Sequence, residues 1–503
     1  MNIKEAKTEI MNAVRAYLRK DERGSYLYPP LRQRPILLMG PPGIGKTAII
    51  EQAADACQVG LVAYTITHHT RQSAIGLPHI VSRRYQGQEY SITEYTLSEI
   101  IASVYECMER TGKREGILFL DEINCVSETL APTMLQFLQN KTFGSHRVPE
   151  GWVIVAAGNP PEYNKSVREF DIVTLDRVRK IEIQADCGVW LEYALERGIH
   201  HSVLSYLSLK KDRFYQVENS ADGKFFVTAR GWEDLSELIK SYEELGLAVN
   251  ADLVIQFLQK KDTARDFAAY YQLYRKYGED YQIQEILSGE ISDAGYQEKL
   301  AMAQAASFEE RFTVTELVLD VLQNGFLEYE GETRFLHRLQ EALRSLKAEA
   351  RSAVFAEDLK KRILQRWDTL KTKEKMELIS GEEACLEARV TETLEEYLLI
   401  LQKEHISGGE QSVQRLGELF EERESVRKRK IAEIREKLER AFGFLAECFG
   451  EEQEMILLVS GLTKNRRAAE FIGRHGCDAY LKYCDVLLGS REEELRQACR
   501  SYL

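Results

Sequence analysis

Short apolar runs alternate with amphipathic stretches between residues 36 and 183. The runs have the length of strands and cover residues 36–39, 61–65, 117–120, 153–157 and 181–183. Between them, residues 47–58, 97–108 and 128–139 carry apolar side chains at three- and four-residue spacing, which is the period of a helix face. This alternation predicts a five-stranded parallel sheet covered by helices.

Two segments inside this pattern look like turns between short extended stretches, at residues 85–90 and 142–152, and either hairpin could project from the sheet. After residue 186 the strand signals fade. Trp232, Leu235, Ile239 and Tyr242 share one face of a predicted helix. We expect three domains: an α/β domain over residues 1–185, a small helical domain over 186–285, and an all-α domain over 286–503 that binds a partner or assists assembly.

Composition narrows the class of protein. A chain of 503 residues is too long for one core, and its 44% hydrophobic and 29% charged residues are typical of a folded, soluble protein. The net charge of −13 does not favour nucleic acid as a partner. The N-terminus does not resemble a signal peptide, no apolar run reaches the length of a membrane span, and the nine cysteines show no CxxC spacing. We therefore expect a cytoplasmic protein.

A phosphate-binding loop follows the first predicted strand. The eight residues Gly40-Pro41-Pro42-Gly43-Ile44-Gly45-Lys46-Thr47 match G-x-x-x-x-G-K-[ST], with a helix predicted directly after them. Glycines let the backbone amides turn toward phosphate, and the helix N-terminus adds partial positive charge. Lys46 is expected to reach the β- and γ-phosphates, and the Thr47 hydroxyl to bind Mg²⁺.

Two adjacent carboxylates end the third predicted strand. Asp121 is expected to hold Mg²⁺, and Glu122 to orient or deprotonate the attacking water. Taken alone, this pair also fits a strand that runs into an acidic helix N-terminus. The phosphate-binding loop upstream favours the catalytic interpretation. Asn159 ends the fourth strand at the same edge of the sheet, where its amide could polarise the γ-phosphate or the water.

The motifs GPPGIGKT, LFLDEIN, AAGNP and LDR, in this order and spacing, resemble those of MoxR-type AAA+ ATPases, within the dynein-related AAA+ group. The resemblance covers about residues 15–285. It implies an αβα P-loop NTPase core with strand order 5-1-4-3-2, a helical lid, and a ring, usually a hexamer, that binds ATP between subunits. Such proteins resemble chaperones that remodel a partner, often one with a von Willebrand factor A domain.

The resemblance also implies roles for three further residues. Asn159 would be sensor 1, Arg177 would be the arginine finger that acts on the next subunit's ATP, and Arg230 would be sensor 2 in the lid. The sequence departs from the family at two places: Val178 and a second candidate finger, Arg179, follow Arg177, and Thr228-Ala229-Arg230 replaces the usual Ser-Pro-Arg.

The motifs together predict an enzyme that hydrolyses ATP to ADP and phosphate with Mg²⁺ and remodels a protein client. The loop contacts phosphates rather than the base, so GTP stays open beside ATP. Two other functions also stay open. One is a nucleotide-gated scaffold with little turnover, against which Glu122 and Arg177 argue. The other is a McrB-like motor directed by nucleic acid, which the net charge disfavours.

Overall fold

The computed structural model describes residues 1–68, 76–143, 146–163, 167, 170–220, 223–347, 355–375, 379–406 and 409–484. The chain forms two compact units, and each is built from two stretches of sequence. The first contains residues 1–193 and 207–268, and the second contains residues 194–206 and 269–503. The chain therefore passes between the units three times.

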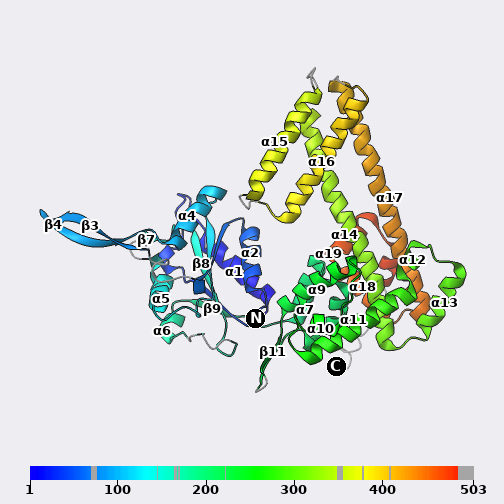
Figure 1. Ribbon diagram of the computed structural model, residues 1–503, viewed down its shortest axis with the longest axis horizontal. Coiled ribbons are helices and arrows are strands. Elements are labelled where there is room, and N and C mark those ends of the chain that lie inside the picture. The colour runs from blue at the N-terminus through cyan, green and yellow to red at the C-terminus, as the bar shows by residue number, and fades with distance from the viewer. Residues whose placement is uncertain are drawn as a thin grey trace, which may run out of the picture. The chain divides into compact units, whose positions relative to one another are not determined.

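The first unit is built around a five-stranded parallel sheet (Figure 1). Its strands are β1 (Ile36–Met39), β2 (Gly60–Thr65), β5 (Gly116–Asp121), β8 (Trp152–Gly158) and β9 (Arg179–Glu182). They lie in the order β2-β5-β8-β1-β9, and every neighbouring pair is parallel. Numbered along the chain, this is 2-3-4-1-5, so the predicted order 5-1-4-3-2 is confirmed. The last strand begins two residues before the predicted run.

Helices cover both faces of the sheet, because strand residues alternate between two cores. Leu38 and Val155 pack in one core with α1 (Ile3–Tyr17) and α2 (Lys46–Cys57). Leu37, Leu118 and Ile154 pack in the other core with α4 (Glu99–Thr111) and α5 (Ala131–Asn140). Because every neighbouring pair of strands is parallel, the carboxyl ends of all five strands meet at one edge of the sheet.

An antiparallel ribbon of β3 (Pro78–Tyr85) and β4 (Gln88–Tyr95) projects from this unit (Figure 1). Its turn is Gln86-Gly87, with φ of +49° and +84°, as the hairpin predicted over residues 85–90 requires. A second, shorter hairpin pairs β6 (Thr142–Phe143) with β7 (His146–Arg147). Residues 144–145 of that predicted hairpin lie outside the described residues.

The remaining elements of the first unit lie before, between and after the sheet strands in the sequence. They are the 3₁₀ turns η1 (Pro30–Arg32), η2 (Ile66–His68) and η3 (Lys211–Arg213), the helices α6 (Ile172–Leu175), α7 (Cys187–Arg197), α9 (Ala229–Glu244) and α10 (Ala251–Val254), and the hairpin β10 (Gln216–Ser220) and β11 (Gly223–Val227). Trp232, Leu235 and Ile239 are buried on one face of α9, as their spacing predicts. The β10–β11 hairpin was not predicted, because its polar residues carry no alternating pattern. α7, α8 (His201–Leu209) and α11 (Lys261–Tyr281) cross the boundaries between units.

The described part of the second unit is all helical, which confirms the all-α prediction for the C-terminal region. Its helices are α12 (Ile283–Ser288), α13 (Asp293–Gln304), α14 (Phe308–Lys347), α15 (Phe355–Lys375), α16 (Gly381–Lys403), α17 (Gly409–Phe449), α18 (Gln453–Lys464) and α19 (Arg466–His475). None of the described helices of the chain is long and apolar enough to cross a membrane.

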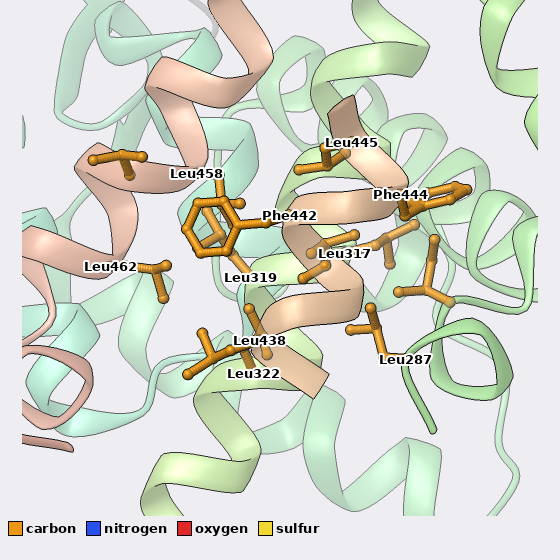
Figure 2. Packing of buried hydrophobic residues seen from close by; sticks show 14 of the residues in the cluster. Leu287, Leu317, Leu319, Leu322, Leu438, Phe442, Phe444, Leu445, Leu458 and Leu462 are labelled. Carbon is orange, nitrogen blue, oxygen red and sulfur yellow. The ribbon is translucent and has the colours of Figure 1, made fainter. Parts of the chain in front are cut away.

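The long helices α14 and α17 contribute to two separate cores. One core joins the first half of α14 to the last part of α17, α18 and α19, and Figure 2 shows Leu322, Leu438 and Phe442 packed inside it. The other core joins the end of α14 to α15, α16 and the start of α17. A 40-residue helix is about 60 Å long at 1.5 Å per residue, so the two cores hold a long helical pair at both ends.

Candidate nucleotide-binding site

The loop between β1 and α2 has the backbone that its glycines allow. Gly43 and Gly45 adopt φ of +73° and +90°, in the left-handed region that favours glycine, and Gly45 is the N-cap of α2. Gly40 has no room for a side chain, because a Cβ there would lie 2.9 Å from the Ile183 carbonyl oxygen. The loop thus turns tightly from the inner strand β1 into the N-terminus of α2.

Lys46 is the centre of the bonding at this site. Its Nζ donates to the carbonyl oxygens of Gly40 and Pro41, and to Asn159 Oδ1, each at 2.8 Å. Burial lowers the pKa of Lys46 to about 8, with a further lowering by the charge of Arg230 and opposing contributions from Asp121 and Glu122. The side chain is held at the carboxyl ends of β1 and β8, where phosphates would lie.

The two carboxylates lie beside this lysine, at the end of β5. Thr47 Oγ1 donates to Asp121 Oδ2 at 3.3 Å, so the two predicted Mg²⁺ ligands are in contact. Mg²⁺ prefers oxygen ligands and commonly takes the rest from phosphate and water. This hydroxyl and carboxylate fit that donor set. Glu122 accepts a hydrogen bond from Thr67 Oγ1 at 3.1 Å.

Three residues of the predicted lid contact the loop directly. The backbone N–H of Arg230 donates to the Gly43 carbonyl at 3.2 Å, and the Tyr215 hydroxyl donates to the Pro42 carbonyl at 2.9 Å. The Thr228 side chain caps α9 through a bond from the Gly231 N–H, and it lies against Gly43. The Arg230 side chain is exposed, but its positive charge contributes to lowering the pKa of Lys46.

The two candidate arginine fingers differ in their surroundings. Arg179 is half-buried and forms an ion pair with Glu9 at 3.1 Å. Arg177 is exposed, and its side chain makes no hydrogen bond or ion pair with any described residue, while its backbone N–H donates to the Thr174 carbonyl at 3.0 Å. The pKa of Asp171 is lowered, mainly by its hydrogen bonds with Thr174. The charge of Arg177 makes a smaller contribution to this lowering. Arg177 therefore does not lie with Lys46 and Glu122, but its guanidinium is available to another molecule.

Sequence reasoning missed two residues that contact the loop or the carboxylates. Thr67 follows the carboxyl end of β2, so the rule that parallel strands end at one edge could have found it. Tyr215 precedes a hairpin that has no sequence signal, and only the folded lid brings its hydroxyl to Pro42.

One family model matches the part of the chain that carries most of this site. The model for the AAA domain of the dynein-related subfamily matches residues 35–178, which span β1 to the end of α6. No curated protein matches the chain. Among solved structures, the crystal structure of a candidate ATPase from Cytophaga hutchinsonii is 16% identical, with a TM-score of 0.21, over 36% of this chain and 51% of that one. This chain thus spans about half of that protein's length. The phosphate-binding loop, the paired carboxylates and the family match identify residues 35–178 as an AAA domain of the dynein-related subfamily.

Proposed function

We propose that this protein binds Mg²⁺-ATP, hydrolyses it to ADP and phosphate, and uses the cycle to remodel a partner protein. The observation that carries the proposal is the set of hydrogen bonds at one sheet edge, which joins Lys46 to Asn159 and Thr47 to Asp121. These are the groups that phosphoryl transfer needs, since positioning and charge stabilisation supply most of its catalysis.

Each residue at the edge has a distinct task in this reaction. Glu122 takes a proton from the attacking water, whose oxygen bonds to the γ-phosphorus while the bond to the β–γ bridging oxygen breaks. Lys46 stabilises the β- and γ-phosphate oxygens, and Asn159 orients the γ-phosphate or the water. Mg²⁺, held by Thr47 and Asp121, would neutralise charge on the β- and γ-oxygens. Arg230 acts from the lid as the second sensor of the nucleotide.

Arg177 rather than Arg179 is the better candidate for the arginine finger. Arg179 is already paired with Glu9, whereas the exposed Arg177 is free to reach a neighbouring subunit. Ile172 and Val173 of the nearby helix α6 are also exposed, at 85% and 55%, and could pack against a neighbour. These features support a ring in which one subunit completes the site of the next. The resemblance to MoxR-type proteins favours a hexamer.

The nature of the client rests on the motif resemblance. MoxR-type proteins are similar to chaperones that often act on a von Willebrand factor A domain, so we expect a protein client of this kind. The helices of residues 286–503 are the candidate surface for binding that client or neighbouring subunits. Deletion of these residues should then abolish client binding, and client binding that survives the deletion would contradict this assignment.

The first experiment is steady-state ATP hydrolysis against protein concentration, with molecular mass measured in parallel. Wild type should gain activity per subunit as it assembles. Glu122→Gln and Arg177→Ala should each reduce the rate by about 10³-fold. The matched control Arg179→Ala should retain most of the activity. An activity that is independent of assembly, or that is lost equally in both arginine variants, would contradict a shared site with Arg177 as the finger. Tight ATP binding without turnover would instead favour a nucleotide-gated scaffold.

A further inference from the structure

The turn that carries Glu122 has an unusual backbone. Glu122 adopts φ of +54°, a left-handed conformation that residues with a Cβ rarely occupy. Such a conformation persists only where the surrounding structure holds it, and it is common at functional sites. The bonds that hold this turn in place therefore decide where the Glu122 carboxylate lies.

The turn is fastened to the end of the neighbouring strand β8. The backbone N–H of Ile123 donates to the Ala157 carbonyl at 2.9 Å, and the N–H of Cys125 closes the turn on the Glu122 carbonyl at 2.9 Å. One residue further along the chain, Asn124 Nδ2 donates to the carbonyl oxygen of Asn159 at 2.8 Å. Asn124 thus connects the turn that bears Glu122 to the residue that contacts Lys46.

The surroundings of Asn124 indicate that its amide side chain serves to make this hydrogen bond to Asn159. The side chain is 2% exposed, and its Oδ1 has no hydrogen-bond partner among the described residues. A buried acceptor without a partner destabilises a protein, whereas an apolar residue at this position would avoid the penalty. The amide also confines its neighbour, because a Cβ on Gly158 would lie 2.5 Å from Asn124 Oδ1. The Asn124 side chain is therefore tightly packed, and only its Nδ2 donor forms a hydrogen bond with a described residue.

We propose that Asn124 is a positioning residue, which fixes Asn159 relative to Glu122 so that the γ-phosphate contact and the water-activating carboxylate stay in register. It acts through Asn159 and the turn, and does not itself contact the nucleotide. The inference rests on the proposed ATPase function. A bond that only stabilised the fold would have no reason to affect hydrolysis more than nucleotide binding.

The test compares Asn124→Ala with wild type in the full chain. The hydrolysis rate at saturating ATP should fall roughly 10- to 100-fold, as small displacements of catalytic groups do, while the Kd for a fluorescent ATP analogue changes less than about threefold. The matched control is Asn465→Ala. Asn465 is a buried asparagine that caps α19, so its removal should lower the melting temperature without changing the rate.

The pH dependence of hydrolysis by Asn124→Asp separates a positioning role from a purely structural one, because a purely structural role predicts no such dependence. The aspartate variant keeps the shape of the side chain but loses the donor when ionised, and regains an O–H donor when protonated. Its rate relative to wild type should therefore rise as the pH falls, and should exceed that of Asn124→Ala where the aspartate is protonated. It also decides the question if the alanine variant does not fold. An aspartate variant no more active than the alanine variant at any pH would overturn the proposal, and so would a lower melting temperature with an unchanged rate.

Hydrogen exchange of the turn separates this proposal from the proposed function. Exchange at residues 121–126 should be faster in Asn124→Ala than in wild type and unchanged in Asn465→Ala. This holds even if wild type hydrolyses no ATP, an outcome that would contradict the ATPase function alone. Unchanged exchange in Asn124→Ala would overturn the positioning role.

Discussion

At the scale of single residues, the nucleotide site depends on a buried cation. Lys46 lies at the end of β1 with three hydrogen-bond acceptors around its Nζ, and burial is the main reason that its pKa falls to about 8. Its ammonium form is the one that attracts phosphate. The protonation of this side chain should therefore affect the affinity of the site for ATP.

This predicts that ATP binding weakens above pH 8. Lys46 is protonated below its pKa and loses its charge above it, so the apparent affinity should fall, approaching about tenfold per pH unit at high pH. Titration of a fluorescent ATP analogue with excess Mg²⁺ between pH 6.5 and 9.5 measures this. Lys46→Arg is the control, because arginine stays protonated throughout that range. A wild-type affinity that is flat across the range would show that the charge of Lys46 is not lost there.

At the scale of elements, the phosphate-binding loop and the lid form one structure. The Gly43 carbonyl accepts a hydrogen bond from the backbone N–H of Arg230. A Cβ added to Gly43 would lie 2.9 Å from Thr228 Cβ. Tyr215 contacts the preceding residue, Pro42. A change in the loop backbone should therefore displace the start of α9.

Gly43→Ala is expected to lower ATP affinity by at least about tenfold and the melting temperature by a few degrees. The new Cβ both strains a φ of +73° and collides with Thr228, so the loop and lid must separate. Gly87→Ala is the matched control, since its φ is +84° but nothing lies within 4 Å of an added Cβ. Binding isotherms and thermal melts of both variants check this. Equal effects of the two substitutions would mean that backbone strain alone matters, without the lid.

At the scale of the whole molecule, the second unit contains a buried ionisable pair. Glu316 on α14 is 7% exposed and lies 3.5 Å from the buried His201 Nδ1. Burial, and then the charge of Asp320, raise the pKa of Glu316 to about 8, while Lys464 opposes the shift. Burial lowers the pKa of His201, so both side chains are held in their neutral forms.

This pair predicts that stability falls as the pH rises from about 4.5 to 8. In that window the folded unit keeps the Glu316 proton, whereas the unfolded chain releases it. Each rise of one pH unit therefore lowers the free energy of unfolding. Glu316→Gln should remove this dependence and melt several degrees above wild type at pH 8, with a smaller difference at pH 5. Glu328→Gln, at an exposed position on the same helix, is the control. Melting curves whose difference does not grow with pH would contradict the prediction.

Because the chain passes between the units three times, we can predict the effect of removing the C-terminal helices. Residues 194–206 belong to the second unit, and Val203, Leu204 and Tyr206 are almost fully buried. A fragment of residues 1–285 lacks most of that unit, including Glu316, which lies 3.5 Å from the buried His201. It should bind ATP but melt several degrees lower and aggregate more readily than the full chain, as measured by thermal melts and light scattering. A fragment as stable as the full chain would show that residues 194–206 do not depend on the second unit.

Local patterns in the sequence determined the chemistry of this protein and the plan of its sheet. The loop from Gly40 to Thr47 and the pair Asp121-Glu122 could be found because their residues are consecutive. Alternating apolar runs predicted five strands, and the family resemblance supplied their order, which the structure confirms.

Tertiary structure decided what depends on residues far apart in the chain. Arg177 and Arg179 look alike in sequence, and only the ion pair of Arg179 with Glu9 distinguishes them. The bond from Asn124 to Asn159 and the approach of His201 to Glu316 also join segments distant in sequence. No local pattern encodes such contacts, because they form only when the sheet and the helices pack.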